Sequence, residues 1–422
     1  MTHNTCPESV CGIFIEARES IHASHVVIDM QNLQDWERDI SKVKVIVETS
    51  SIKVTSSDGL SVIFPLPDIR LVPQSCHSLQ WMAGEGLHMR LETQYKANPP
   101  DGVSFAGESL NLREEIELLS SQKYCQFACK VCGANILRAN SHLKRVLQLP
   151  SENWQDVLDD WYCHGNTTVE KMKKTCLIPK ENDCFVGNLY ISIGVTSLLD
   201  DSLDFADSSC HIQTSKVSDS NVVIKCAKCH AQLGETSAAA IREWQHKSFH
   251  PNECVKLYKH CITVPGNCEL FKSYSLESYF AHTLKIRSLI DTGFRYIVQS
   301  ESGNQTAVAL IWLMNTDTKL ITNMATPNTA LHQFVGPHYQ FDDSHQQSLM
   351  SYSIVKILFQ SCIGKQNKGL LAEWLKDSAV QSIMLPYEHC LQILLLLFTN
   401  NNHLPKSQRT NSHFKVSYLR LK

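Results

Sequence analysis

Two cysteine pairs of the same pattern restrict the fold of this chain more than any other feature of its sequence. The stretches "CKVCGANIL", residues 129–137, and "CAKCHAQLG", residues 226–234, both read Cys-x-x-Cys-x-Ala, followed by an amide and then an aliphatic side chain. Two residues between the cysteines let a tight turn direct both sulfurs at one metal ion, and four thiolates complete a tetrahedral zinc site. We therefore expect one structural zinc ion, held by Cys129, Cys132, Cys226 and Cys229.

The two pairs lie far apart in sequence, with 93 residues between Cys132 and Cys226. The entropic cost of closing such a loop rises by only about 0.6 kcal/mol per doubling of its length. Zinc binding in small metal-dependent modules is worth about 10–16 kcal/mol, which exceeds that cost. One alternative is that the second pair closes a site locally. Another is that both pairs are unligated core thiols. The candidate ligands for local closure are His250, Cys254, His260 and Cys261.

The composition indicates which kind of molecule the protein binds and in which cellular compartment it is found. The chain has 39 basic and 42 acidic residues, so it lacks the basic surface expected for direct binding to nucleic acid or to an anionic membrane. Its longest apolar run, Ala307–Met314, is shorter than the roughly 18 residues of a membrane span. The first residues, "MTHNTCPESV", lack the pattern of a secretory signal. We expect protein partners in the cytosol or the nucleus, where thiols stay reduced.

The distribution of periodic segments predicts an α+β fold. Residues 12–95 alternate as strands do and are rich in Val and Ile, and a turn-rich break follows at residues 98–102. Helical spacing is concentrated after residue 270. We expect three domains: a β-rich domain at 1–120, a zinc-stapled region at 121–269 and a helix-richer C-terminal domain at 270–422.

A cysteine and a histidine fall at the end of a predicted helix in "PSENWQDVLDDWYCHG", residues 150–165. The negative end of that helix and the nearby Asp159 and Asp160 disfavour a thiolate, so Cys163 is poorly placed as an unaided nucleophile. A metal ion can deprotonate a thiol outright, which leaves Cys163 and His164 as ligands offered to a partner's metal centre. The alternative is a half-buried cysteine beside a tryptophan face.

A second candidate nucleophile lies in "MLPYEHCLQILLLLF", residues 384–398. An acyl-accepting cysteine needs exposure and a local base, and His389 could be that base for Cys390. The nearly continuous apolar helix that follows supports the alternative, a buried and inert cysteine. Motifs of serine hydrolases, phosphate-binding loops and zinc proteases are absent from the sequence.

These four stretches together resemble the HECT-like ubiquitin-protein ligases that bind the ubiquitin-conjugating enzyme of cyclin turnover. The resemblance implies that the chain accepts ubiquitin from a conjugating enzyme and transfers it to cyclin B-like substrates and to itself. It also implies a segment that binds the conjugating enzyme near residues 253–275. Leu385, Pro386 and Cys390 match the surroundings of the catalytic cysteine in ordinary HECT ligases.

Some residues depart from the HECT pattern: His389 stands where a threonine is usual, and Leu391 and Gln392 replace the Phe and Asn that normally follow the cysteine. The Trp-x-Cys-His element resembles factors that associate with the metal-dependent endonuclease of mRNA 3′-end processing. That likeness implies a binding module acting through Trp161, Cys163 and His164. The two functional hypotheses are therefore a ubiquitin ligase that uses Cys390 and His389, and a zinc-stapled module that engages the endonuclease.

Overall fold

The structure is a computed structural model, and it describes most of the chain in segments. The described residues are 12–29, 43–56, 61–94, 112–121, 126–138, 143–149, 178–180, 182–205, 221–237, 241, 254–266, 270–289, 291–300, 306–323, 349–364 and 367–421. The chain divides into two compact units. Unit 1 combines Met1–Pro100 with Leu276–Lys422, and unit 2 is Asp101–Ser275.

A large mixed sheet forms the centre of unit 1, in the order β22-β23-β20-β19-β1-β2-β8-β6. Strands β18 and β21 extend it beside β19, and β7 pairs with β8. The bounds are β1 Gly12–Arg18, β2 Ala23–Asp29, β6 Arg70–Leu71, β7 His77–Met82, β8 Gly86–Gln94, β18 Arg295–Ser300, β19 Ala307–Thr322, β20 Met350–Ser361, β21 Val380–Leu385, β22 Thr410–Asn411 and β23 Phe414–Arg420.

Strand β19 joins the two ends of the chain in this sheet. Its first half pairs with β18, with Tyr296 opposite Ile311, and its second half pairs with β1, with Phe14 opposite Thr322. The sequence pattern predicts separate domains for the N-terminal strands and the C-terminal segment, but the two share one sheet in the structure. Unit 2 is inserted between them in sequence.

Burial on both faces explains the apolar run at the start of β19. Val308 and Ile311 contact one hydrophobic cluster, while Leu310 lies in another cluster. A strand covered on both sides reads as a continuous apolar stretch rather than as an alternation. The polar second half of β19 follows irregularities in its pairing with β20 between Leu313 and Thr318.

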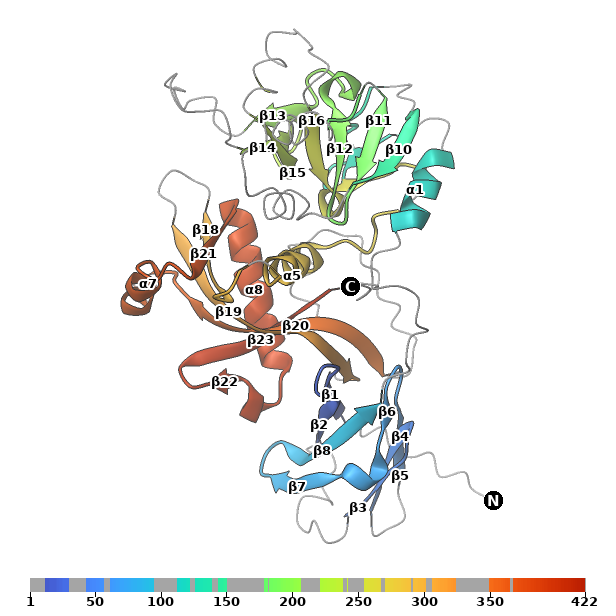
Figure 1. Cartoon of the computed structure of the whole chain (residues 1–422), viewed down its shortest axis with the longest axis vertical. Coiled ribbons are helices and arrows are strands. Elements are labelled where there is room, and N and C mark those ends of the chain that lie inside the picture. The colour runs from blue at the N-terminus through green and yellow to red at the C-terminus, as the bar shows by residue number, and fades with distance from the viewer. Residues whose placement is uncertain are drawn as a thin grey trace, which may run out of the picture. The chain divides into compact units, whose positions relative to one another are not determined.

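Two helices, α5 (Leu276–Arg287) and α8 (Tyr387–His403), cover one face of the sheet (Figure 1). The short helix α7 (Lys368–Trp374) contributes Trp374 to the cluster on the other face. Helix α8 begins after Pro386, whose fixed φ suits the start of a helix. Strands β18 to β23 hold more residues of this segment than its helices do, so the expected helix-richer C-terminal domain is not supported. The fold is α+β and predominantly β.

A smaller three-stranded antiparallel sheet completes the N-terminal part of unit 1. Its strands are β3 Val43–Val47, β4 Ser51–Ser56 and β5 Ser61–Pro65. Ile52, Val54 and Phe64 from this sheet join Ile13 and Val26 of the large sheet in one buried cluster. Single 3-10 turns occur at η2 Pro73–Ser75 and η5 Lys406–Gln408.

Unit 2 is built on a seven-stranded sheet in the order β10-β11-β12-β16-β15-β14-β13. A two-stranded ladder, β9 with β17, and helix α1 accompany it. The bounds are α1 Leu112–Ser121, β9 Ala128–Cys129, β10 Arg145–Gln148, β11 Asp183–Val186, β12 Tyr190–Gly194, η3 Val195–Ser197, β13 Leu203–Phe205, β14 Asn221–Cys226, β15 Gln232–Ser237, β16 Cys254–Tyr258, η4 Lys259–Cys261 and β17 Ile262–Thr263.

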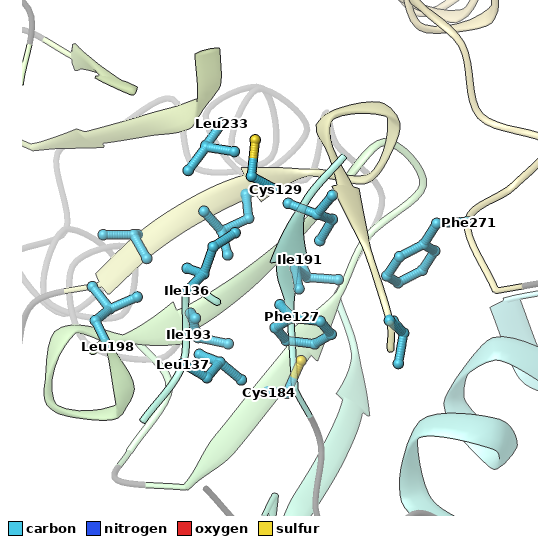
Figure 2. Packing of buried hydrophobic residues seen from close by; sticks show 14 of the residues in the cluster. Phe127, Cys129, Ile136, Leu137, Cys184, Ile191, Ile193, Leu198, Leu233 and Phe271 are labelled. Carbon is cyan, nitrogen blue, oxygen red and sulfur yellow. The ribbon is translucent and has the colours of Figure 1, made fainter. Parts of the chain in front are cut away.

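One hydrophobic cluster fills unit 2, and Phe127, Ile191 and Ile193 are fully buried in it. Figure 2 shows Cys129 at one end of this cluster, with its sulfur directed away from Phe127 and Cys184. The first cysteine of the sequence motif therefore belongs to the core through its backbone and offers its sulfur at the core's edge. No helix among the described residues is long and apolar enough to cross a membrane.

Candidate metal centre

The first cysteine pair forms a tight turn directly after β9. The N–H of Gly133 donates to the carbonyl oxygen of Cys129 at 2.8 Å, and the N–H of Cys129 donates to the carbonyl oxygen of Ala134 at 2.8 Å. Gly133 has a φ of +69°, a left-handed conformation that glycine adopts without a steric penalty. The turn holds Cys129 and Cys132 so that their side chains leave on the same side. We call this turn, residues 129–134, the first knuckle.

The second cysteine pair forms the same turn between β14 and β15, and we call residues 226–231 the second knuckle. The N–H of His230 donates to the oxygen of Cys226 at 2.8 Å, and the N–H of Cys226 donates to the oxygen of Ala231 at 2.8 Å. His230 takes the place of Gly133 and has a φ of +56°. The repeated Cys-x-x-Cys-x-Ala pattern thus encodes a repeated backbone geometry.

The two knuckles meet. The four thiol sulfurs all lie within 4.8 Å of one another. The Sγ atoms of Cys129 and Cys229 are 3.7 Å apart, and those of Cys132 and Cys226 are 3.6 Å apart. In a regular tetrahedron with metal–sulfur bonds of about 2.3 Å, the sulfurs lie about 3.8 Å apart. The cluster therefore has the donor type, the number of ligands and the spacing that a tetrahedral metal ion requires.

Neighbouring strands hold each knuckle in place. Cys129 pairs with Ile262 in the β9–β17 ladder, and the N–H of Lys130 donates to the oxygen of Cys261 at 3.0 Å. Beside the second knuckle, Gly234 lies so close to β16 that an added Cβ would sit 1.8 Å from the carbonyl oxygen of Lys256. Only glycine permits this approach.

The surroundings of the sulfurs explain why a metal ion would matter here. Burial raises the pKa of the Cys129 thiol, although the backbone N–H groups of Cys132 and Val131 favour its thiolate. A bound cation deprotonates a coordinating thiol outright and removes this penalty. The residues present therefore fit a closed site with four cysteine ligands.

Local closure of the second pair does not occur among the residues that the structure describes. Cys254 begins strand β16, and His260 and Cys261 belong to the turn η4, while the four-sulfur cluster includes none of them. Burial raises the pKa of Cys261 to about 12, as expected for a core thiol. His250 lies outside the described residues.

Cys390 is in the first turn of α8, and its side chain is in the hydrophobic cluster under that helix. It is 1% exposed, and its thiol donates to the carbonyl oxygens of Gln299 at 3.5 Å and Leu385 at 3.6 Å. Burial lowers the pKa of the neighbouring His389 to about 4, so this imidazole is neutral and weakly basic. The sequence suggests Cys390 as the residue that accepts ubiquitin and His389 as its base. In the structure, however, the thiol of Cys390 is enclosed by β18, β21 and α8.

The element with Trp161, Cys163 and His164 lies outside the described residues, and its role in binding an endonuclease stays a prediction. The segment expected to bind a conjugating enzyme, residues 253–275, contains β16, η4 and β17. Most of its described side chains are buried, and Pro265, Gly266, Lys272 and Ser273 are the exposed ones.

A buried ionic cluster in unit 2 was not expected from the sequence. The Nζ of Lys259, a fully buried residue, donates to Glu115 Oε2 at 2.5 Å and to the hydroxyl of Tyr274 at 3.1 Å. That hydroxyl donates to Glu115 Oε1 at 2.6 Å. The cluster ties α1 to η4 and to the end of the unit. The sequence offers no distinct signal for it, because the stretch from Val255 to Val264 contains two lysines, Lys256 and Lys259.

Comparison with known proteins identifies the family of the chain. The family model described as HECT-like ubiquitin-conjugating enzyme (E2)-binding matches residues 16–416. A Homo sapiens protein whose name describes it as an E3 ubiquitin-protein ligase is 27% identical over 97% of this chain and 98% of its own length. The Mus musculus protein of the same name is 28% identical over the same shares. No solved structure matches. The chain belongs to the HECT-like ubiquitin-conjugating enzyme (E2)-binding family.

Proposed function

We propose that this protein is a ubiquitin ligase that binds a ubiquitin-conjugating enzyme and promotes transfer of ubiquitin to lysines of a substrate and of the chain itself. The observation that carries the proposal is the match over nearly the whole chain to a family defined by binding of the conjugating enzyme. The relatives are named E3 ubiquitin-protein ligases, and these names support attachment of ubiquitin as the reaction. Cyclin B-like proteins are the substrate class that the sequence resemblance implies.

The four-cysteine cluster supports a structural role for zinc in this function. Four thiolates fill a tetrahedral coordination shell, so no position is left for water or substrate. Cys129, Cys132, Cys226 and Cys229 would hold the ion, which would connect β9 with the β14–β15 hairpin across 93 intervening residues. The metal would then stabilise unit 2 and take no part in the transfer itself.

The position of Cys390 favours direct transfer from the conjugating enzyme to a lysine. A thioester exchange would require the Cys390 sulfur to come within about 3–3.5 Å of the ubiquitin carbonyl carbon. That sulfur is 1% exposed and donates to two backbone carbonyls, and the neutral imidazole of His389 supplies no positive charge to hold a thiolate. We infer that Cys390 contributes packing and that the bound conjugating enzyme carries the reactive thioester.

Reconstitution with activating enzyme, a panel of conjugating enzymes and ubiquitin tests both parts of the proposal. The full chain should retain at least one conjugating enzyme in a pull-down and should form lysine-linked ubiquitin products that survive reducing agent. If it binds none of the panel and forms no product, the ligase function is wrong.

The route is resolved by Cys390→Ala, with Cys362→Ala as a matched control because Cys362 is also buried in unit 1, at 8% exposure. Direct transfer predicts that both variants ligate ubiquitin at the wild-type rate and that no ubiquitin adduct on the chain is cleaved by thiols. A thiol-sensitive adduct that is present in wild type and Cys362→Ala but absent in Cys390→Ala would instead establish the covalent route.

A further inference from the structure

The four cysteines of the metal centre differ in how far solvent reaches them. Cys129 and Cys226, the first cysteine of each knuckle, are each 1% exposed. Cys132 and Cys229, the second of each knuckle, are partly exposed. A small oxidant in solution can therefore reach one cysteine of each knuckle, while the other cysteine is covered from solvent.

Two sulfur contacts shorter than 4 Å run between the knuckles. The partly exposed Cys132 lies 3.6 Å from buried Cys226, and the partly exposed Cys229 lies 3.7 Å from buried Cys129. Each accessible sulfur thus faces a buried sulfur of the opposite knuckle. This arrangement of an accessible thiolate with an adjacent resolving cysteine is the one that redox-sensing cysteines use.

We propose that this centre is a peroxide-sensitive switch in which a disulfide between the two knuckles replaces the metal ion. The inference rests on the zinc centre proposed above but not on ubiquitin transfer. It gives the four cysteines a disulfide-bonded, metal-free state in addition to the metal-bound state of a structural zinc site.

The chemistry balances with hydrogen peroxide as the oxidant. The Cys132 thiolate attacks one peroxide oxygen, the O–O bond breaks, and the products are a sulfenic acid on Cys132 and one hydroxide. The Cys226 thiolate then attacks the Cys132 sulfur, an S–S bond forms and a second hydroxide leaves. Two thiolates have lost one electron each, and peroxide has gained two. A metal ion held by the four cysteines would be released with its charge unchanged, because the two remaining thiolates, Cys129 and Cys229, would no longer close its coordination shell.

A disulfide between the knuckles keeps them joined, as a bound metal ion would. The first knuckle stays joined to the second across the 93-residue separation, so β9 and the β14–β15 hairpin keep their proximity. Disulfides inside each knuckle would instead leave the two segments unconnected. Because thiol–disulfide exchange reverses the bond, reduction would restore the four thiolates beside one another, ready to bind zinc again.

The test uses the full chain purified with its metal. Zinc per chain is measured first, then hydrogen peroxide is added, released zinc is followed with a coloured chelator, and the protein is digested without reduction for mass spectrometry. We expect zinc release together with a peptide containing Cys132 linked to one containing Cys226, or the corresponding pair from Cys129 and Cys229. Reductant and added zinc should return the metal content to its starting value.

Two variants separate the proposal from general oxidation. Cys132→His with Cys229→His keeps four ligands of types that zinc accepts but removes both accessible thiols, so release should slow by about tenfold or more. Cys76→Ser removes an exposed cysteine of unit 1 and should release zinc at the wild-type rate. Before oxidation, circular dichroism and zinc content show whether each variant is folded and loaded.

Several outcomes would overturn the switch. Purified protein without zinc removes the centre itself. Peptides joined only within a knuckle, by Cys129–Cys132 or Cys226–Cys229 bonds, would contradict the geometry. Release from a loaded double-histidine variant at the wild-type rate would show that the accessible sulfurs are not the point of attack.

Discussion

The sulfur of Cys132 lies 3.6 Å from the sulfur of Cys226, a residue 94 positions later in the chain. Through this contact and its counterpart between Cys129 and Cys229, two short turns hold together the β9–β17 ladder and the β14–β15 hairpin. The stability of unit 2 should therefore depend on the metal.

Removing one buried ligand should abolish metal binding and unfold unit 2. The binding energy of structural zinc, about 10–16 kcal/mol, is as large as the whole stability of a typical domain, about 5–15 kcal/mol. We expect Cys226→Ser to lose stoichiometric zinc by elemental analysis and to lose one thermal transition. Cys254→Ser, in the same unit but outside the four-sulfur cluster, is the matched control and should keep its metal. Full zinc content in Cys226→Ser would contradict the shared site.

Glycine substitutions near the two knuckles should differ in severity for a steric reason. At Gly234, an added Cβ meets backbone of β16 at 1.8 Å, so Gly234→Ala forces strands apart and should destabilise unit 2 by about 3 kcal/mol or more. At Gly133, nothing lies within 4 Å, and only the φ of +69° penalises alanine, by about 1–2 kcal/mol. Urea unfolding of both variants measures the difference. Equal losses would mean that the approach of Gly234 to β16 is not retained in solution.

The four-cysteine cluster could be predicted from sequence because its information is local and repeated. Each knuckle contains the residues that form its own turn. The same Cys-x-x-Cys-x-Ala pattern begins at Cys129 and at Cys226, and this repetition indicates that the two knuckles form one site. The pairing of Phe14 with Thr322 has no such signal, since any of many strands could lie beside β1. The sequence therefore does not reveal that strands from residues 1–120 and strands from residues 270–422 share a sheet.

Burial was the other property that the sequence left open. The apolar residues that follow Cys390 are compatible with a covered helix or with a nucleophile at its start, and only the packing of α8 on the sheet distinguishes them. Lys259 shows the opposite problem. A lysine is expected at the surface, and its complete burial depends on Glu115 from a helix 144 residues earlier.

Breaking the buried ionic cluster should cost more than breaking an exposed ion pair. Lys259→Met leaves the Glu115 carboxylate buried without its cation, which typically costs about 3–5 kcal/mol. The pair Lys256–Glu235 is 3.0 Å long but partly exposed, so Lys256→Met should cost about 0–1 kcal/mol.

The double variant Lys259→Met with Glu115→Leu removes both charges and should recover much of the loss. Denaturant unfolding of the two single variants and the double variant gives the coupling energy between Lys259 and Glu115. If the two losses simply add, the two side chains do not interact in the folded protein.

Unit 1 should lose stability as the pH falls, because His25 must stay neutral. Burial, followed by the charge of His88, lowers the pKa of His25 from 6.5 to about 4. Arg90 and Lys356 also lower this pKa, whereas Glu16 opposes the shift.

The hydrogen bond of His25 has the same requirement. The side-chain amide of Gln408 donates to His25 Nδ1 at 2.9 Å, and this nitrogen can accept only while it carries no proton. The unfolded chain takes up a proton at this histidine near pH 6.5, whereas the folded chain does so near pH 4.

Stability from this group is therefore complete above pH 6.5 and declines through the interval down to about pH 4, by at most about 1.4 kcal/mol per pH unit. The measurement is the free energy of unfolding by urea at several pH values, for wild type and for His25→Gln. Glutamine at position 25 does not titrate, so its slope between pH 6.5 and 4 should be shallower than that of wild type. Parallel slopes would show that His25 already binds its proton in the folded state near pH 6.5, and that the Gln408 contact does not hold it neutral.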